Sequence, residues 1–310
     1  MKVTIIGASG NIGSCTAFSI AVSGLADNLV MIDNFSFDRL RQYVSDLRTA
    51  VSGQDVLVSA GKDRDMEESD IVIIAAGSAN VIKSRMEVLP QNLPIVRDIC
   101  ANIKAYCPDA VVIIATNPVC PLNYALYLCS GLDRKKLIGY SANDSIRFRE
   151  LMAQALGVKT SWVEATVIGE HGNSQVLLFS SVRVDGKPVK VTEDIKQKVR
   201  KEVADIPARL EELRIATGRT AAWTTAVGLT AVCRAIIKDT GAMIPCSVVL
   251  DGEYGCRNMS MTVPAVLGKD GVREILEWEL PPDEREGLEN SINTLAPAMR
   301  YAEEFLGKNR

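Results

Sequence analysis

Histidine is almost missing from this chain, because His171 is the only imidazole in 310 residues. An excess of one sign of charge is also missing: 35 Lys and Arg against 38 Asp and Glu give a formal net charge of -3, and no long block of like charges occurs. This excludes the basic footprint of a nucleic-acid-binding protein. The apolar runs are shorter than the roughly 18 residues of a membrane span, and the first run is too short for a signal peptide. We therefore expect a cytoplasmic protein that binds neither nucleic acid nor membranes.

Cysteine is present but follows no regular spacing. The eight cysteines, from Cys15 to Cys256, form no C-x-x-C pair, and most lie inside apolar runs. Zinc sites and the disulfide frameworks of small secreted domains both depend on regular spacing. We expect these residues to be small buried side chains of a reduced compartment, and we expect no metal site.

Short β-branched runs alternate with longer helical patterns through the first half of the chain. The runs are continuously apolar, which is typical of strands buried on both faces of a parallel sheet. They lie at residues 2–7, 28–33, 55–60, 70–77 and 110–118. Alternation of strand and helix predicts an α/β fold with a doubly wound parallel sheet.

The pattern changes after about residue 143. Strands are expected at 160–169 and 177–189, the latter turning at Asp185 and Gly186. Long helices follow, then an antiparallel pair at 246–255 and 259–268, and finally an amphipathic helix. Since no linker separates the halves, we predict two domains that share an interface, residues 1–143 and 144–310.

A glycine-rich turn follows the first predicted strand. Gly7, Gly10 and Gly13 permit a tight turn, close approach of a pyrophosphate, and close packing of helix on strand. Asn11 and Ile12 open the helix, whose N-terminus offers N–H donors to phosphates. A purely structural turn is the alternative.

Asp33 favours the nucleotide-binding interpretation. It ends the second strand, 20 residues after Gly13, where a carboxylate accepts hydrogen bonds from an adenosine ribose. Its charge would repel a 2′-phosphate, and the nearest arginines, Arg39 and Arg41, lie further along the next helix. The pattern predicts NAD as the cofactor.

Four further stretches occur in order: "AAGSANVIKSRMEVLPQN", "ATNP", "NDSIRFR" and "GEHG". With the glycine turn and Asp33, the chain resembles the lactate and malate dehydrogenase family over nearly its whole length. The resemblance implies a Rossmann-type doubly wound sheet that binds NAD, followed by an α+β substrate-binding domain. It also implies a small 2-oxo or L-2-hydroxy acid as substrate and a homodimer or homotetramer as the assembly.

Reduction of a 2-oxo acid needs a hydride at the carbonyl carbon and a proton at its oxygen. His171 can supply that proton near neutral pH. By resemblance Asp144 orients His171, although an acid that stabilises a helix N-terminus is a second role for it. Arg147 lies three residues later, on the same helix face. The resemblance implies that it holds the substrate carboxylate through its planar fork.

The resemblance implies four more site residues. Arg85 would polarise the substrate carbonyl, and Asn92, which keeps the family's spacing from it, would contact the cofactor. Asn117 would contact the nicotinamide ribose and the substrate, although an Asn-Pro turn also explains it. Thr220 would lie near the substrate, although threonine is common near helix starts.

The chain departs from the family at two places. Malate dehydrogenases have an arginine six residues before Arg85 for the second carboxylate, but Ala79 and Asn80 stand here. Oxaloacetate is therefore in doubt unless Lys83 substitutes, since a second carboxylate buried without a cation is costly. Asn173 replaces the usual aspartate after the histidine, and nothing in the sequence explains that change.

Two rival functions stay open. One is an NAD-dependent glycosidase that uses a cysteine–histidine metal site, with Cys120 as the candidate ligand. The other is a nucleotide-binding protein without catalysis. The set of Asp144, Arg147 and His171 favours the dehydrogenase over both.

Overall fold

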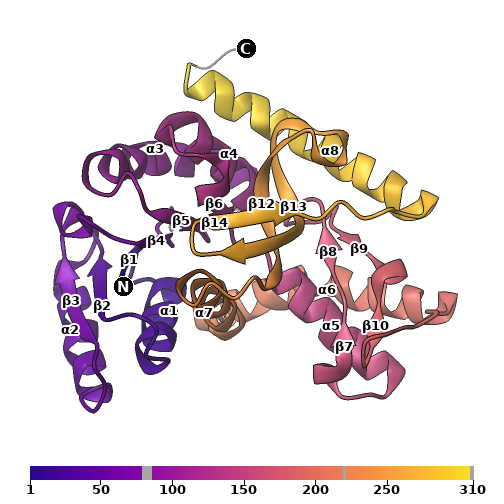
Figure 1. Cartoon of the computed structure of the whole chain (residues 1–310), viewed down its shortest axis with the longest axis horizontal. Coiled ribbons are helices and arrows are strands. Elements are labelled where there is room, and N and C mark those ends of the chain that lie inside the picture. Colours follow the sequence, from indigo (N-terminus) through magenta and orange to yellow (C-terminus); the bar gives the residue numbers. More distant parts are fainter. Residues whose placement is uncertain (79–85, 219–220, 308–310) are drawn as a thin grey trace.

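The computed structural model describes residues 1–78, 86–218 and 221–307. Within these residues one large sheet runs through the molecule, with helices on both faces (Figure 1). Its strands are β1 (Lys2–Ile6), β2 (Asn28–Ile32), β3 (Leu57–Gly61), β4 (Ile71–Ile74), β5 (Val111–Ile114), β6 (Leu137–Gly139), β12 (Met243–Asp251), β13 (Arg257–Gly268) and β14 (Gly271–Ile275). Their order is β14-β13-β12-β6-β5-β4-β1-β2-β3, with β1 to β6 parallel and β12 to β14 antiparallel. The predicted α/β class, with a Rossmann-type doubly wound sheet, is confirmed.

Helices pack on both faces of the sheet. The described α-helices are α1 (Asn11–Val22), α2 (Phe37–Ala50), α3 (Leu89–Tyr106), α4 (Val119–Ser130), α5 (Asn143–Leu156), α6 (Glu193–Thr217), α7 (Trp223–Ile237) and α8 (Pro282–Phe305). The helix α6 packs against α5. Val3 and Ile5 of β1 pack in a cluster with α1, α2 and α7, whereas Ile6 packs with α3 and α4. Because neighbouring strand residues face opposite sides, a strand covered on both sides is apolar throughout.

The strand order places a switch point at the carboxyl end of β1. The sheet grows outward from β1 to β2 and β3 on one side, and through β4, β5 and β6 on the other. Ligands of doubly wound sheets bind where the order reverses in this way. The segments that leave β1, β2, β4, β5 and β6 therefore meet at one edge.

The antiparallel strands extend the same sheet. β12 bonds to β6 through Ser247 and Gly139, so the sheet crosses the predicted boundary between residues 143 and 144. The β12–β13 pair is confirmed, whereas β14 was not predicted. The division into two domains stays a prediction.

The strands between residues 160 and 189 are shorter than predicted. They are β7 (Val163–Glu164), β8 (Val167–Ile168), β9 (Val176–Leu177), β10 (Arg183–Val184) and β11 (Lys187–Pro188). The chain changes partners between them, because β7 pairs with β10 and β8 pairs with β9. The predicted turn is confirmed: Asp185 and Gly186 have φ values of 51° and 71°, as a type I′ hairpin requires.

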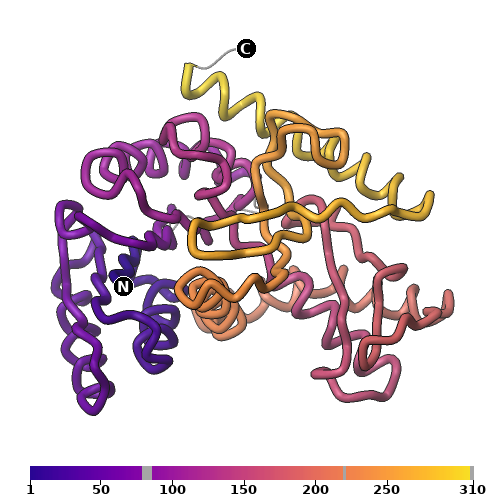
Figure 2. Tube along the Cα trace, viewed as in Figure 1, coloured from indigo at the N-terminus to yellow at the C-terminus, as the bar shows by residue number. Residues whose placement is uncertain are grey.

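The C-terminal helix α8 joins the two halves of the molecule. Figure 2 shows it running across the molecule from the region of β9 to that of α4. At its start Glu284 accepts hydrogen bonds from Ser180, and near its end Glu303 accepts one from Tyr124 of α4. None of the helices in the described ranges is long and apolar enough to cross a bilayer.

One expectation about cysteine is wrong. Cys100 of α3 and Cys129 of α4 form a disulfide, with 6.3 Å between their Cα atoms. The two residues are 29 positions apart and become neighbours only when the helices pack. The other six cysteines are free, and five of them are buried, as predicted.

Candidate active site

The glycine turn between β1 and α1 is formed by backbone in close contact. Gly7 has φ of +82°, and a Cβ atom on it would lie 2.5 Å from the Ala76 nitrogen. A Cβ on Gly13 would lie 2.3 Å from the Gly7 oxygen, so α1 could not pack on the turn. At Gly10 the nearest atom would be 3.1 Å away. Gly10 is the N-cap of α1, so Asn11 and Ile12 form its first turn, at the switch point.

Asp33 ties this turn to the end of β2. Its Oδ2 accepts hydrogen bonds from the Ser9 N–H at 3.1 Å and the Ser9 hydroxyl at 2.5 Å. Its Oδ1 accepts one from the Phe35 N–H at 3.0 Å. Arg39 lies nearer than its sequence position suggests, because α2 turns back and its Nη2 donates to Ser9 Oγ at 3.3 Å. Arg41 instead lies over the Phe37 ring.

Asn117 follows β5 at the same edge. Its Oδ1 is buried and has no hydrogen-bond partner among the described residues. Asn92 of α3 holds the backbone here: its Nδ2 donates to the Asn117 carbonyl at 2.7 Å, and its Oδ1 accepts from the Ser78 N–H at 2.7 Å. Since Asn92 is only 3% exposed, its amide is buried within the protein. The orphaned Asn117 oxygen is an acceptor that fits a bound hydroxyl or amide.

Asp144, Arg147 and His171 come together, as predicted. Asp144 lies in the first turn of α5, where both of its predicted roles are possible at once. Its Oδ2 lies 2.5 Å from Nδ1 of His171, and its Oδ1 lies 3.7 Å from Nη1 of Arg147. The carboxylate is 7% exposed and the histidine 9% exposed. This buried carboxylate therefore holds a histidine and a guanidinium together.

A hollow of about 200 Å³ opens beside Asp144 and Arg147, and His171 is not among its described lining residues. Asp144 and Arg147 line one side, and Glu170, Gly172 and Asn173 line the next. The remaining described lining residues are the polar Gln175 and the apolar Met86, Val203, Ile206 and Pro207. Arg147 is the only Lys or Arg side chain among the described residues that line the hollow. The predicted site residues Lys83, Arg85 and Thr220, and the departures Ala79 and Asn80, lie outside the described residues.

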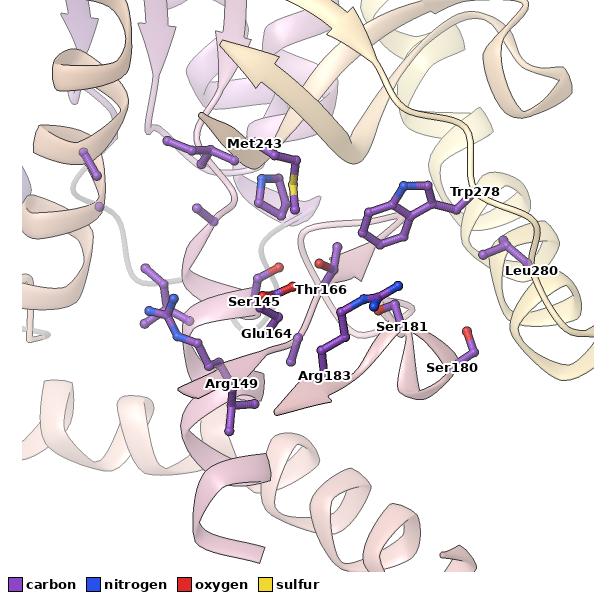
Figure 3. A pocket seen from close by; sticks show the side chains of 18 of the residues that line it. Ser145, Arg149, Glu164, Thr166, Ser180, Ser181, Arg183, Met243, Trp278 and Leu280 are labelled. Atoms are coloured by element: carbon purple, nitrogen blue, oxygen red, sulfur yellow. The ribbon is translucent and has the colours of Figure 1, made fainter. Parts of the chain in front are cut away.

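A larger hollow of about 990 Å³ lies elsewhere, between α5, the β7–β10 strands and the segment after β14. Figure 3 shows Arg149, Arg183 and Trp278 around it. Asp144, Arg147 and His171 do not line it. Arg149 therefore faces away from the site of Arg147, as its two-residue offset predicts.

Cys120 lies next to the histidine and is buried. Burial raises the pKa of its thiol to about 11, and nearby polar groups such as Ser247 only partly oppose this. Among the residues with described positions, no group of three or more His, Cys, Asp or Glu side chains is placed to hold a metal ion.

Sequence reasoning missed the groups that hold the histidine in place. Ser291 of α8 and Thr262 of β13 bond to the segment around His171, and the Glu170 carboxylate lies beneath it. These residues are far apart in sequence and belong to no motif. The adjacent Glu170 in "GEHG" was the one available signal.

The fold and this site define a class of protein. A glycine turn at the switch point of a doubly wound sheet is the arrangement that binds dinucleotides. A buried histidine–carboxylate pair is an arrangement that can transfer protons. Together they are the arrangement of an NAD-dependent dehydrogenase.

Comparison with known proteins gives the family. A model of the lactate/malate dehydrogenase NAD-binding domain matches residues 1–139, and a model of the alpha/beta C-terminal domain of lactate/malate dehydrogenase matches residues 143–306. The chain therefore belongs to the lactate/malate dehydrogenase family, whose members carry out NAD-linked oxidation and reduction of 2-hydroxy and 2-oxo acids. This membership removes the support for the glycosidase alternative.

The relatives include both activities. A malate dehydrogenase of Natronomonas pharaonis is 35% identical over 95% of this chain and 97% of its own length. L-lactate dehydrogenase 1 of Staphylococcus aureus is 33% identical over 98% of each chain. Cryptosporidium parvum malate dehydrogenase superposes with a TM-score of 0.91 at 30% identity, covering 98% of this chain and 99% of its own. The lactate dehydrogenase of that organism, solved with lactic acid and NAD, gives 0.89 at 32% identity, covering 97% and 98%.

Proposed function

We propose that His171, Asp144 and Arg147 carry out the acid–base and carboxylate-binding parts of the reaction. The observation that supports this is the contact of one buried carboxylate with both other residues. With Asp144 at Nδ1, the proton of neutral His171 is held there, and Nε2 is the nitrogen that exchanges a proton with the substrate oxygen. Arg147 binds the substrate carboxylate beside it. The roles of Arg85 and Thr220 remain predictions from the sequence.

The cofactor residues are proposed in the same way. NAD(H) accepts or supplies the hydride when bound. The turn from Gly7 to Gly13 would hold its pyrophosphate, Asp33 its adenosine ribose, and Asn117 its nicotinamide ribose. The predicted cofactor contact of Asn92 stays a prediction. Because both ends of its amide bond to the backbone of Ser78 and Asn117, we propose that it also positions Asn117.

We further propose that a 2-oxo monocarboxylate is a better substrate than oxaloacetate. Among the described residues that line the hollow, Arg147 is the single cation, whereas Asp144 and Glu170 are acids. Most of the other described lining residues are apolar. A second substrate carboxylate would be buried here beside like charges. Ala79 in place of the arginine of malate dehydrogenases supports the same preference.

The test compares initial rates of NADH oxidation with oxaloacetate, pyruvate and a bulkier 2-oxo monocarboxylate. We expect kcat/KM for one of the monocarboxylates to exceed that for oxaloacetate by at least about tenfold, since one misplaced group in a pocket changes discrimination by that order. The Arg147→Ala variant gives the background rate. Higher kcat/KM with oxaloacetate would overturn the preference and point to a cation such as Lys83.

The assembly is proposed to be a homodimer or homotetramer. The helix α1 packs against α7, and its residues Phe18 and Val22 are exposed. Trp223 and Val227 of α7 are 78% and 64% exposed beside them. These four residues line one hollow, and such a continuous apolar face is typical of a subunit interface.

Light scattering on wild type and on Trp223→Ser/Val227→Asp tests this. We expect at least a dimer for wild type and a shift toward monomer for the double variant. Leu57→Ser is the control, because Leu57 is an exposed apolar residue on the edge strand β3. A monomeric wild type would contradict the proposal.

A further inference from the structure

We call the segment 169–174, which carries His171, the histidine loop. Besides the contact of His171 with Asp144, three sets of hydrogen bonds hold this loop, two to other elements and one within the loop itself. At its start Gly169 exchanges two backbone hydrogen bonds with Thr262 of β13, at 2.9 and 2.8 Å. This fixes the residue two positions before the histidine against the large sheet. The side chain of His171 then meets Asp144 of α5.

The second contact comes from α8. Ser291 is fully buried, and its Oγ accepts a hydrogen bond from the Glu170 N–H at 2.6 Å. The helix approaches so closely that a Cβ atom on Gly169 would lie 2.5 Å from this oxygen. Gly169 also has φ of +87°, so both the backbone and the contact require glycine here. The backbone immediately before His171 is thus fixed by a residue 121 positions from Glu170.

The third contact lies within the loop. Oε2 of Glu170 accepts hydrogen bonds from the Ser174 N–H at 2.9 Å and the Ser174 hydroxyl at 2.5 Å. A Cβ atom on Gly172 would lie 2.5 Å from Oε1 of the same carboxylate. The Glu170 side chain therefore turns back under the loop and bonds across its two ends. Both bonds use one oxygen, and a neutral amide oxygen has lone pairs for the same two donors.

We propose that Ser291 and Glu170 are positioning residues that hold His171 at Asp144 in the geometry required for proton transfer. The inference rests on the proposed acid–base role of His171. Loss of the Ser291 oxygen leaves the buried Glu170 N–H without its acceptor, and loss of the Glu170 carboxylate frees the far end of the loop. A displacement of about 1 Å in a catalytic group reduces turnover by roughly 100-fold.

The test measures kcat and KM for the best 2-oxo acid, together with the Kd of NADH, in Ser291→Ala, Glu170→Ala and Glu170→Gln. We expect the two alanine variants to lose about 10- to 100-fold in kcat, with the Kd of NADH within about twofold of wild type. Glu170→Gln should retain most of the turnover that Glu170→Ala loses, because the amide oxygen replaces the acceptor.

Ser180→Ala is the matched control. Ser180 also bonds to α8, through Glu284, but it lies outside the histidine loop. It should lose comparable thermal stability while keeping kcat within about threefold of wild type, as expected for a contact remote from the site. If Ser291→Ala and Glu170→Ala keep kcat within that same range, the positioning inference is wrong. If Glu170→Gln falls as far as Glu170→Ala, the charge matters and the inference is also overturned.

His171→Asn separates this inference from the proposed function. If His171→Asn is inactive while Ser291→Ala and Glu170→Ala are fully active, the proposed role of His171 is retained and only the positioning inference is rejected. An active His171→Asn variant removes the proposed function itself.

Discussion

The two sides of the site are built on different physical principles. The glycine turn of the cofactor side is a backbone structure: Gly7 and Gly13 act through missing side chains, and both belong to one short continuous segment. The acid–base side depends on side chains from distant segments, because Asp144 reaches His171, and Ser291 reaches the adjacent Glu170 N–H, only in the folded chain. A short local pattern can therefore specify the first side, whereas the second depends on the whole fold.

The largest effect is expected for the loss of a side chain on the acid–base side. Arg147→Ala should lower kcat/KM for 2-oxo acids by about 1000-fold, because loss of one partner of a charged hydrogen-bonded pair costs about 4 kcal/mol. NADH binding should stay within about twofold, since Arg147 lies apart from the glycine turn. Steady-state kinetics and NADH fluorescence titration measure the two quantities.

Arg149→Ala is the control for that variant. Arg149 is on the same helix but faces the larger hollow (Figure 3). We expect unchanged kcat/KM in Arg149→Ala. Normal turnover combined with weak NADH binding in Arg147→Ala would contradict the division between the two sides.

The disulfide cross-links two helices that pack on the parallel part of the sheet. Cys100 and Cys129 close a loop between α3 and α4, and a cross-link over 29 residues stabilises a fold by about 3 to 4 kcal/mol. Reduction should lower the free energy of unfolding by that order, measured by chemical denaturation with and without dithiothreitol. Cys100→Ala/Cys129→Ala should show no response to the reductant. An unchanged wild-type midpoint under reduction would contradict the expectation.

Alkaline pH should lower the free energy of unfolding through the buried thiol of Cys120. Cys120 lies on α4 near the backbone of His171, and burial raises the pKa of its thiol to about 11. The folded state therefore holds the thiol proton more tightly than the unfolded state, in which the pKa is about 8.5. The resulting stability is complete below that value and is lost as the pH rises toward 11, by about 3 kcal/mol. Denaturation at pH 8 and pH 10.5 should show a smaller loss in Cys120→Ala than in wild type, and equal losses would contradict this.

The same contrast explains what the sequence could predict. The glycine turn and the spacing of Asp144 and Arg147 are local, and continuous apolar runs reveal strands covered on both faces. Periodicity shows that a side chain is buried but does not show its partner. For this reason the β6–β12 pairing, the Cys100–Cys129 disulfide and the Ser291 contact could not be predicted.

The smallest effect is expected for a substitution in the glycine turn of the cofactor side. Gly13→Ala places a Cβ atom 2.3 Å from the Gly7 oxygen, whereas Gly10→Ala meets its nearest atom at 3.1 Å. Overpacking of this kind costs about 2 kcal/mol, so α1 should shift from the turn and the Kd of NADH should rise about 30-fold in Gly13→Ala. Gly53→Ala, which has open space around it, serves as the control for a general effect of alanine. At saturating NADH, Gly13→Ala should recover most of its kcat, because the histidine loop is held from α8 and β13. If kcat stays low at saturation, the two sides are coupled through α1, and the contrast between local and distant construction fails.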